Sequence, residues 1–302
     1  MNAAPAFTLR DVGLIALICL AWGCNFLTSA AALRELPPLM FTALRMAVLG
    51  LALLPFLTRP PRGQWPALIA VVLCNVVLHF GLSFWSLKLA GDLASPAIVM
   101  QVYVPMSVLL AWLMRGERFA WRTGLAILVS FSGILVLGFD PIVLDNPQSL
   151  ALMLASALFL AIGTVLMRGL SGIDAFSMQA WSAWIGLGPL LAWSAWVEPD
   201  ALHAVAQAGW IAWGGVAWAA LVASLLGHSL FFKLVQKHPV AQIAPYLLMA
   251  PIVAVLLGVV VWGDRPGPRL WIGGAMVLGG VLAIALRALV KQRVIAPDPS
   301  EI

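Results

Sequence analysis

Charged residues are scarce in this chain of 302 residues. Asp, Glu, Lys and Arg make up only 10% of it, whereas hydrophobic residues make up 63%. A soluble domain carries about a quarter charged residues. The chain therefore cannot cover a water-facing surface, and lipid must be its main solvent. The net charge of +5 does not indicate nucleic-acid binding, because the basic residues lie in short connections between apolar runs.

Cysteine and the common catalytic motifs are also scarce or missing. Cys19, Cys24 and Cys74 all fall within apolar runs, are odd in number and lack metal-ligand spacing. They therefore predict neither a disulfide framework nor a metal site. The sequence contains no HExxH and no GxSxG, so zinc-hydrolase and nucleophile-elbow chemistry are excluded. We expect no catalytic residues and no cofactor.

The apolar runs are long enough to cross a membrane. A hydrocarbon core of roughly 30 Å takes about 20 helical residues. The first run is too long for a signal-peptide core and is predicted to be a span. The chain is expected to be an all-α integral membrane protein with ten spans and only short connections. Cut at charged or Pro/Gly-rich breaks, the predicted spans are 12–33, 38–58, 65–87, 93–114, 121–139, 149–168, 174–196, 210–234, 239–262 and 268–290.

Lys and Arg are distributed unevenly between alternate connections. With the N-terminus in the cytoplasm, twelve lie on the inner side and four on the outer side. This bias follows the positive-inside rule. Both termini, including a polar tail at 291–302, are expected in the cytoplasm.

The two halves of the chain resemble each other. "LMRGERFAWR" (113–122) returns as "VVWGDRPGPR" (260–269), and Gly133 matches Gly280 at the same offset of 147. Five spans is an odd number, so the second copy must enter the membrane upside down. The sequence therefore predicts inverted repeats over 12–139 and 149–290. Such repeats place a substrate site near the bilayer midplane and work by alternating access.

Three segments carry a family resemblance: "AWGCNF" (21–26), "ALRM" (43–46) and "GERFAWRTGLAILVSFSGILVL" (116–137). They resemble the EamA family of the drug/metabolite transporter superfamily, over about residues 12–290. The chain is similar to YddG-type and cysteine-type amino-acid exporters of bacterial inner membranes. The resemblance implies ten spans in two repeats, an inner-membrane location and efflux of amino acids or related metabolites.

Polar side chains recur at helical spacing inside the predicted spans. Asn75, His79, Ser83 and Ser86 share one face of the third span. The alternative to cavity lining is hydrogen bonding between helices. Gln101 and Tyr246 lie at near-equivalent depths and are predicted gates. The other substrate-binding candidates are Trp22, Asn25, Tyr103, Ser224, His228 and Gln242, with Trp181 and Trp184 as walls for flat or apolar side chains.

Prolines interrupt the fourth span at Pro96 and Pro105 and the ninth at Pro245 and Pro251. Each removes a backbone donor and frees a carbonyl, which kinks the helix or offers an acceptor to a ligand. We expect hinges at these matched positions. A fixed packing kink is the alternative.

Arg45 is the lone charge well inside a predicted span, and no predicted span holds a carboxylate to pair with it. One interpretation is that it snorkels outward or caps freed carbonyls. The other is a bidentate grip on a substrate carboxylate.

These features favour a transporter of a small neutral or zwitterionic metabolite, such as an aromatic, neutral or cysteine-like amino acid. Without Asp or Glu in the spans, the common carboxylate ion relay is missing. Phosphorylated substrates would need several Lys or Arg side chains in the cavity, and only Arg45 lies well inside a predicted span. The alternatives are export of another metabolite or drug-like compound, an integral-membrane enzyme using His79 and His228, and a scaffold. No association motif stands out, so a monomer in the lipid bilayer is expected.

Overall fold

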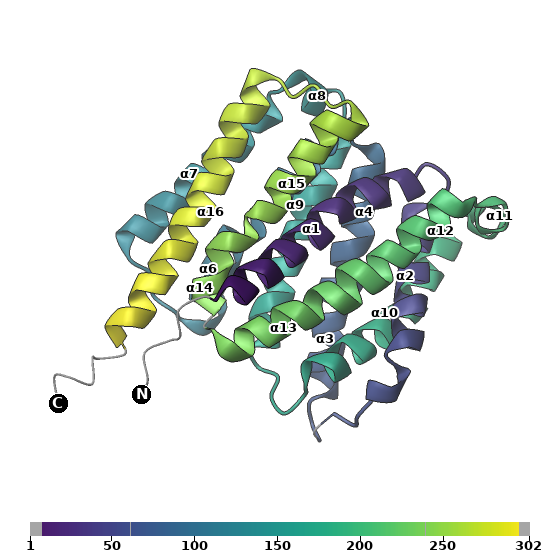
Figure 1. Ribbon diagram of the computed structural model, residues 1–302, viewed down its shortest axis with the longest axis horizontal. Helices are drawn as coiled ribbons and strands as arrows, with labels where there is room; N and C mark the ends of the chain where they lie inside the picture. The colour runs from purple at the N-terminus through teal and green to yellow at the C-terminus, as the bar shows by residue number, and fades with distance from the viewer. Residues whose placement is uncertain (1–7, 61, 239, 296–302) are drawn as a thin grey trace.

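A computed structural model describes residues 8–60, 62–238 and 240–295, and every regular element in those ranges is helical. The α-helices are α1 (Leu9–Ala32), α2 (Pro38–Ala52), α3 (Trp65–Val72), α4 (His79–Leu89), α5 (Ala94–Met100), α6 (Tyr103–Arg115), α7 (Trp121–Gly138), α8 (Pro141–Leu144), α9 (Pro147–Met167), α10 (Ala175–Val197), α11 (Ala201–Gln207), α12 (Trp210–Ala217), α13 (Gly227–Lys237), α14 (Val240–Leu247), α15 (Met249–Leu257) and α16 (Pro268–Ile295). Figure 1 shows them as a bundle.

The bundle belongs to a multi-pass membrane protein. Eight helical stretches are long and apolar enough to cross a membrane, and all fall on predicted spans. They are Leu9–Ala32, Trp65–Leu89, Ala94–Arg115, Trp121–Gly138, Pro147–Met167, Trp210–Lys237, Gln242–Trp262 and Pro268–Val290. The remaining two predicted spans coincide with α2 and α10, which pack against each other.

One predicted span was too long, and two helices continue beyond their predicted spans. The second span was expected to reach residue 58, but α2 ends at Ala52 and a short 3₁₀ turn (Leu54–Phe56) follows. Pro55 explains the stop, because it has no N–H to continue the helix. The first helix begins at Leu9, so it includes Asp11, which pairs with Lys237 at 2.8 Å. The last helix continues to Ile295, and the tail at 296–302 lies outside the described residues.

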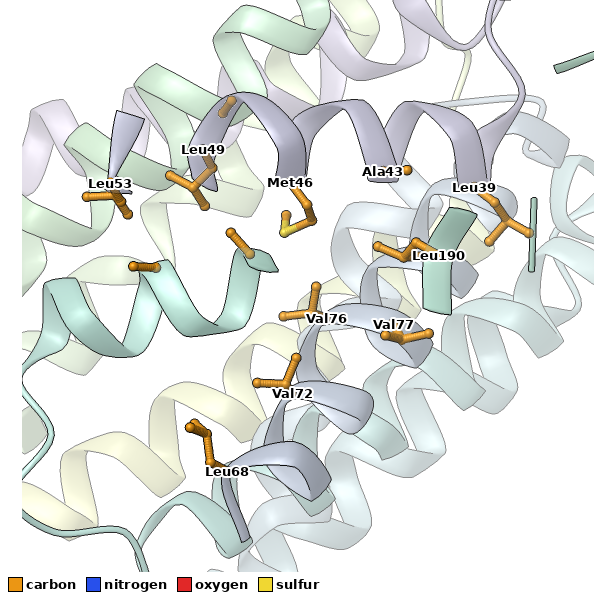
Figure 2. Close-up of a cluster of buried hydrophobic side chains, with 13 residues drawn as sticks. Leu39, Ala43, Met46, Leu49, Leu53, Leu68, Val72, Val76, Val77 and Leu190 are labelled. Carbon is orange, nitrogen blue, oxygen red and sulfur yellow. The ribbon is translucent and has the colours of Figure 1, made fainter. Parts of the chain in front are cut away.

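One hydrophobic cluster fixes α2 in the bundle. Its inward side chains Leu39, Ala43, Met46, Leu49 and Leu53 follow helical spacing, as expected for a packed face. Figure 2 shows this row facing the side chains of the third span and Leu190 of α10. Arg45 lies off this row and turns toward the eighth span.

The fourth and ninth spans break near Pro105 and Pro251, whereas Pro96 lies in the first turn of α5 and Pro245 lies inside α14. The fourth divides between α5 and α6 at Gln101, and the ninth between α14 and α15 at Leu248. These residues lie about four positions before Pro105 and Pro251, where a proline ring excludes the normal helical bond. The carbonyl of Gln101 instead accepts the N–H of Val104 at 3.1 Å.

Wider π-helical turns occur in the third, eighth and ninth spans. They cover η2 (Leu73–Leu78), η3 (Trp218–Leu226) and η4 (Gly258–Trp262). The segments η2 and η3 occupy positions that the repeat aligns. Single π-helical turns are frequent at functional sites, and these two lead into His79 and His228.

The helices α7 and α16 lie side by side (Figure 1) with their backbones in close contact. A Cβ on Gly133 would meet Gly273 and Val277, and one on Gly280 would meet Ala126 and Ser130. The small residues therefore permit an approach that larger ones would block.

Candidate functional site

Arg45 of α2 is buried inside the bundle and is 2% exposed. Its Nε and Nη2 donate to Ser224 Oγ at 3.1 and 2.7 Å, and its guanidinium stacks over the Phe80 ring at 4.0 Å. Nη1 is buried without a hydrogen-bond partner among the described residues. The residue neither snorkels outward nor pairs with a carboxylate within the described part of the chain.

Ser224 connects Arg45 to the eighth span. Its hydroxyl donates to the carbonyl of Ala219 at 2.8 Å, a bond five residues back that fits the π-helical turn. The carbonyl of Ser224 lies 3.0 Å from His228 Nδ1. Arg45, Ser224 and His228 thus form one polar cluster between the halves.

Trp22 closes the cluster on the side of α1. Its ring centroid lies 5.4 Å from that of His228, and its Nε1 donates to the carbonyl of Ala223 at 3.0 Å. Asn25, one turn further along α1, accepts a long hydrogen bond of 3.4 Å from Ser29 Oγ and is half-buried. Of the sequence candidates, the structure brings Trp22, Arg45, Ser224 and His228 together.

The polar face of the third span lies against α9. His79 Nδ1 is 2.8 Å from Ser156 Oγ, and the Ser156 hydroxyl donates to the His79 carbonyl at 2.9 Å. Ser86 likewise donates to the carbonyl of Ser149 at 2.7 Å. Ser83 and Asn75 lie along the same helix, contacting Met153 and Gly163. His79 and Ser86 use their hydrogen bonds on α9, whereas Asn75 Oδ1 is buried without a hydrogen-bond partner among the described residues. Substrate contact by these groups stays a prediction.

The two predicted gates differ in exposure. Gln101 is 9% exposed and its amide reaches back to the carbonyl of Ala97 at 3.4 Å, whereas Tyr246 is 47% exposed. Tyr103 and Gln242 are half-buried. Gating by these residues stays a prediction.

The two deeper tryptophans of α10 contact α2 and the connection that follows it. Trp181 donates from Nε1 to the carbonyl of Thr58 at 2.8 Å and packs edge-on against Trp65. Trp184 packs against Gly50, and its Nε1 has no hydrogen-bond partner in the described residues. Trp181 thus lies at the end of α2 rather than beside Arg45.

Sequence reasoning missed a set of buried carboxylates at the end of the bundle that holds α8. A cavity of about 280 Å³ there is lined by Arg34, Lys88, Asp92 and Trp262, among others. Burial, with nearby Asp264 and Asp140, raises the pKa of Asp92 to about 6. Burial also raises the pKa of Asp264. The sequence shows that each of these carboxylates lies close to an apolar run. That they come together in space depends on how the helices pack.

The EamA-like transporter family matches this chain twice, over residues 10–139 and 148–286. The chain belongs to that family. As an EamA-like transporter it has a small-molecule substrate and works in the lipid bilayer, as its apolar helices require.

Named relatives cover most of this EamA-like chain. It is 24% identical to a probable amino-acid metabolite efflux pump of Escherichia coli (strain K12), covering 90% of this chain and 93% of that protein. It is 27% identical to a probable terminal-alkyne amino-acid exporter of Streptantibioticus cattleyicolor (81% and 82% covered). It is 28% identical to a probable biotin transporter of Pseudomonas aeruginosa (78% and 84% covered).

The fold is also similar to that of a solved structure. A crystal structure with 18% sequence identity matches with a TM-score of 0.62, covering 95% of this chain and 99% of that one. The likeness concerns the fold alone.

Proposed function

We propose that this EamA-like transporter exports a small zwitterionic metabolite, an amino acid with a neutral or aromatic side chain. It is not an enzyme in this proposal and needs no cofactor. The observation that carries the proposal is the buried Arg45, whose Nη1 lacks a hydrogen-bond partner in the described residues.

A carboxylate is the natural complement of this group. A buried guanidinium with unsatisfied N–H groups is costly, and carboxylates satisfy arginine through short, charge-assisted hydrogen bonds. Ser224 Oγ already accepts hydrogen bonds from Nε and Nη2. The substrate carboxylate would therefore bind on the Nη1 side as the cluster opens, with Trp22 and His228 beside its amino group and side chain.

Transport is proposed to follow alternating access between two inverted five-helix repeats, 12–139 and 149–290, with ten spans in all. One family matching both halves supports this. The glycine contacts between α7 and α16 also support it, because they are reciprocal. The contact of Gly133 with Gly273 becomes the contact of Gly280 with Ala126 when each residue is replaced by its equivalent, 147 positions away, in the other repeat. Ser130 donates to Val277 at that same separation, as residues on a twofold axis would.

Helix breaks and location complete the proposal. The matched interruptions near Pro105 and Pro251 are proposed hinges, and Pro96 and Pro245 flank them. Gln101 and Tyr246 are proposed gates. We propose a monomer in a bacterial inner membrane with both termini in the cytoplasm, the orientation that its basic residues favour. Nucleic acid has no role.

A second candidate is export of a carboxylate that is not an amino acid. The relative named as a probable biotin transporter favours it, since biotin also carries a carboxylate on an apolar body. The same Arg45 would bind it. Competition between the two classes separates the candidates.

The test is uptake of labelled amino acids into proteoliposomes, with unlabelled amino acids and biotin as competitors. For Arg45→Gln we expect the apparent Kd for a carboxylate substrate to rise at least about tenfold, because one charge-assisted hydrogen bond is worth about 1.5–3 kcal/mol. Arg45→Lys should rescue it only partly, since lysine lacks the planar fork.

The matched control is Arg122→Gln, at an exposed arginine beside Trp121. It should transport like the unaltered protein. An Arg45→Gln protein with unchanged affinity would remove the carboxylate site from the proposal. Binding of an amino-acid amide, which lacks the carboxylate, should be indifferent to the substitution.

A further inference from the structure

The fourth and ninth spans end in the same local structure. Each stops at a glycine in the left-handed conformation, Gly116 with φ 67° and Gly263 with φ 88°. The next residue is acidic, and its N–H bonds back six positions: Glu117 to Ala111 at 3.3 Å, Asp264 to Gly258 at 2.9 Å. A left-handed glycine is a common way for a helix to end, and here it presents a carboxylate at each end of the bundle.

At one end the carboxylate joins the two halves. Asp264 Oδ2 accepts the backbone N–H groups of Leu93 at 2.8 Å and Ala94 at 3.2 Å, at the start of the fourth span. Asp264 is only 7% exposed. A Cβ on Gly258 would collide with this carboxylate, so the glycine makes the bond possible.

At the other end the matching carboxylate is turned elsewhere. The Glu117 side chain is 50% exposed, and it pairs with Arg168 at 2.8 Å and Arg115 at 3.9 Å. The offset of 147 that relates Asp264 to Glu117 relates residues 93 and 94 to 240 and 241, which begin α14. Glu117 therefore has an equivalent target at the start of the ninth span.

Helix packing has the same asymmetry. The segments α5 and α15 pack together at the end closed by Asp264. The repeat relates this pair to α14 and α6, which show no comparable packing in the described part of the chain. The fourth and ninth spans are thus joined at the end that holds α8 and apart at the other.

We propose that Asp264 and Glu117 are reciprocal gate residues, each capping the first N–H groups of the other repeat's broken span in one of two transport states. The inference rests on the alternating access proposed above. In this structure Asp264 holds the outer gate shut. When the outer gate opens, Glu117 leaves Arg168 and caps the start of α14, which closes the inner gate.

The surroundings of Asp264 suit a helix cap that must be broken during transport. Asp264 Oδ1 is buried without a hydrogen-bond partner among the described residues, so the closed state leaves one acceptor unsatisfied. The inner copy has Ala111 where the outer has Gly258. A glutamate, one methylene longer than aspartate, can reach past that Cβ.

The test measures both gates by pulsed electron paramagnetic resonance on protein whose native cysteines are replaced by alanine. Spin-labelled cysteines at the exposed Gly91 and Arg265 report the outer gate, and those at Arg118 and Val240 the inner gate. We expect Asp264→Asn to shift the ratio of states about fivefold toward an open outer gate, the scale of losing one helix cap. Glu117→Gln should shift it the opposite way.

Two further variants keep the test sharp. Gly258→Ala keeps the Asp264 carboxylate but pushes it away from the N–H groups that it caps. This variant should therefore act like Asp264→Asn. Asp140→Asn is the matched control, because Asp140 caps α16 through Leu270 (2.9 Å) at the same end but outside the gate. It should leave both distances unchanged.

The double variant Asp264→Asn with Glu117→Gln should return toward the unaltered ratio. Shifts in the same direction for both single variants, or none for Glu117→Gln, would overturn the gate. The distances need no substrate, so reciprocal shifts in a protein that transports no tested amino acid would reject the proposed substrate and keep the gate. Transport of an amino acid without such shifts would keep the proposed substrate and reject the gate.

Discussion

At the scale of single residues, the hydrogen-bond capacity of Ser224 limits what Arg45 can do. A serine oxygen has one proton to donate and two lone pairs to accept with. Ser224 accepts twice from Arg45 and donates once to Ala219, so its capacity is used. The remaining N–H groups on Nη1 therefore depend on a ligand or a rearrangement.

Asp92 gives the protein a measurable pH dependence. Its pKa is raised from the ordinary 3.8 to about 6, so between these values the folded protein binds more protons than the unfolded chain. The free energy of unfolding should therefore fall as pH rises from about 4 to 6 and then level off. Asp92→Asn should make that slope shallower, and the raised pKa of Asp264 should account for what is left of it. Melting temperatures in detergent from pH 4.5 to 7.5 would show it.

The comparison needs an exposed carboxylate, and Asp145 provides one. Asp145→Asn should keep the slope of the unaltered protein. If the Asp92→Asn protein keeps that slope too, another group is responsible for it.

At the scale of helices, the two prolines of the fourth span stand in different surroundings. Pro105 follows the break at Gln101, and its missing N–H leaves that carbonyl to Val104. Both prolines lie in the first turn of a helix, but Pro105 directly follows α5 and interrupts a span, whereas Pro96 follows a connection and interrupts none. The two prolines therefore differ in what their removal changes.

Pro105→Ala should stabilise a straight fourth span. A proline inside a helix costs about 3 kcal/mol, so its removal is expected to slow transport at least about tenfold while the melting temperature rises or stays unchanged. Pro96→Ala should alter neither. Initial uptake rates in proteoliposomes, normalised to folded protein, measure the effect. Equal rates for both variants would mean that the break is a fixed kink.

Local signals predicted the helices well and failed where packing decides. Apolar runs ended by Pro, Gly or charge fixed most span limits, but Pro55 was missed because the run around it stays apolar. The π-helical turns have no residue pattern of their own. The face of Asn75 and His79 was visible, yet only the arrangement of helices shows that α9 covers it. The Asp264 cap joins residues 171 positions apart, beyond any local pattern.

At the scale of the whole molecule, the proposed topology places Arg265 outside and Arg118 inside the cell. Both are exposed, and a membrane-impermeant maleimide should reach a cysteine at only one of them in intact cells. We expect labelling of Arg265→Cys and no labelling of Arg118→Cys until the membrane is permeabilised. The reverse pattern would place both termini outside.

The contact between α7 and α16 has a consequence for how such a chain tolerates change. Gly133 and Gly280 touch equivalent places on each other's helix, as the surfaces of a homodimer do. A free-standing half of this kind would present a self-complementary surface and pair with its own copy as a closed antiparallel dimer. In the joined chain that surface is shared by two different sequences. Because each glycine faces backbone atoms of the other helix, a bulky residue at either position can be accommodated only if the two helices move apart.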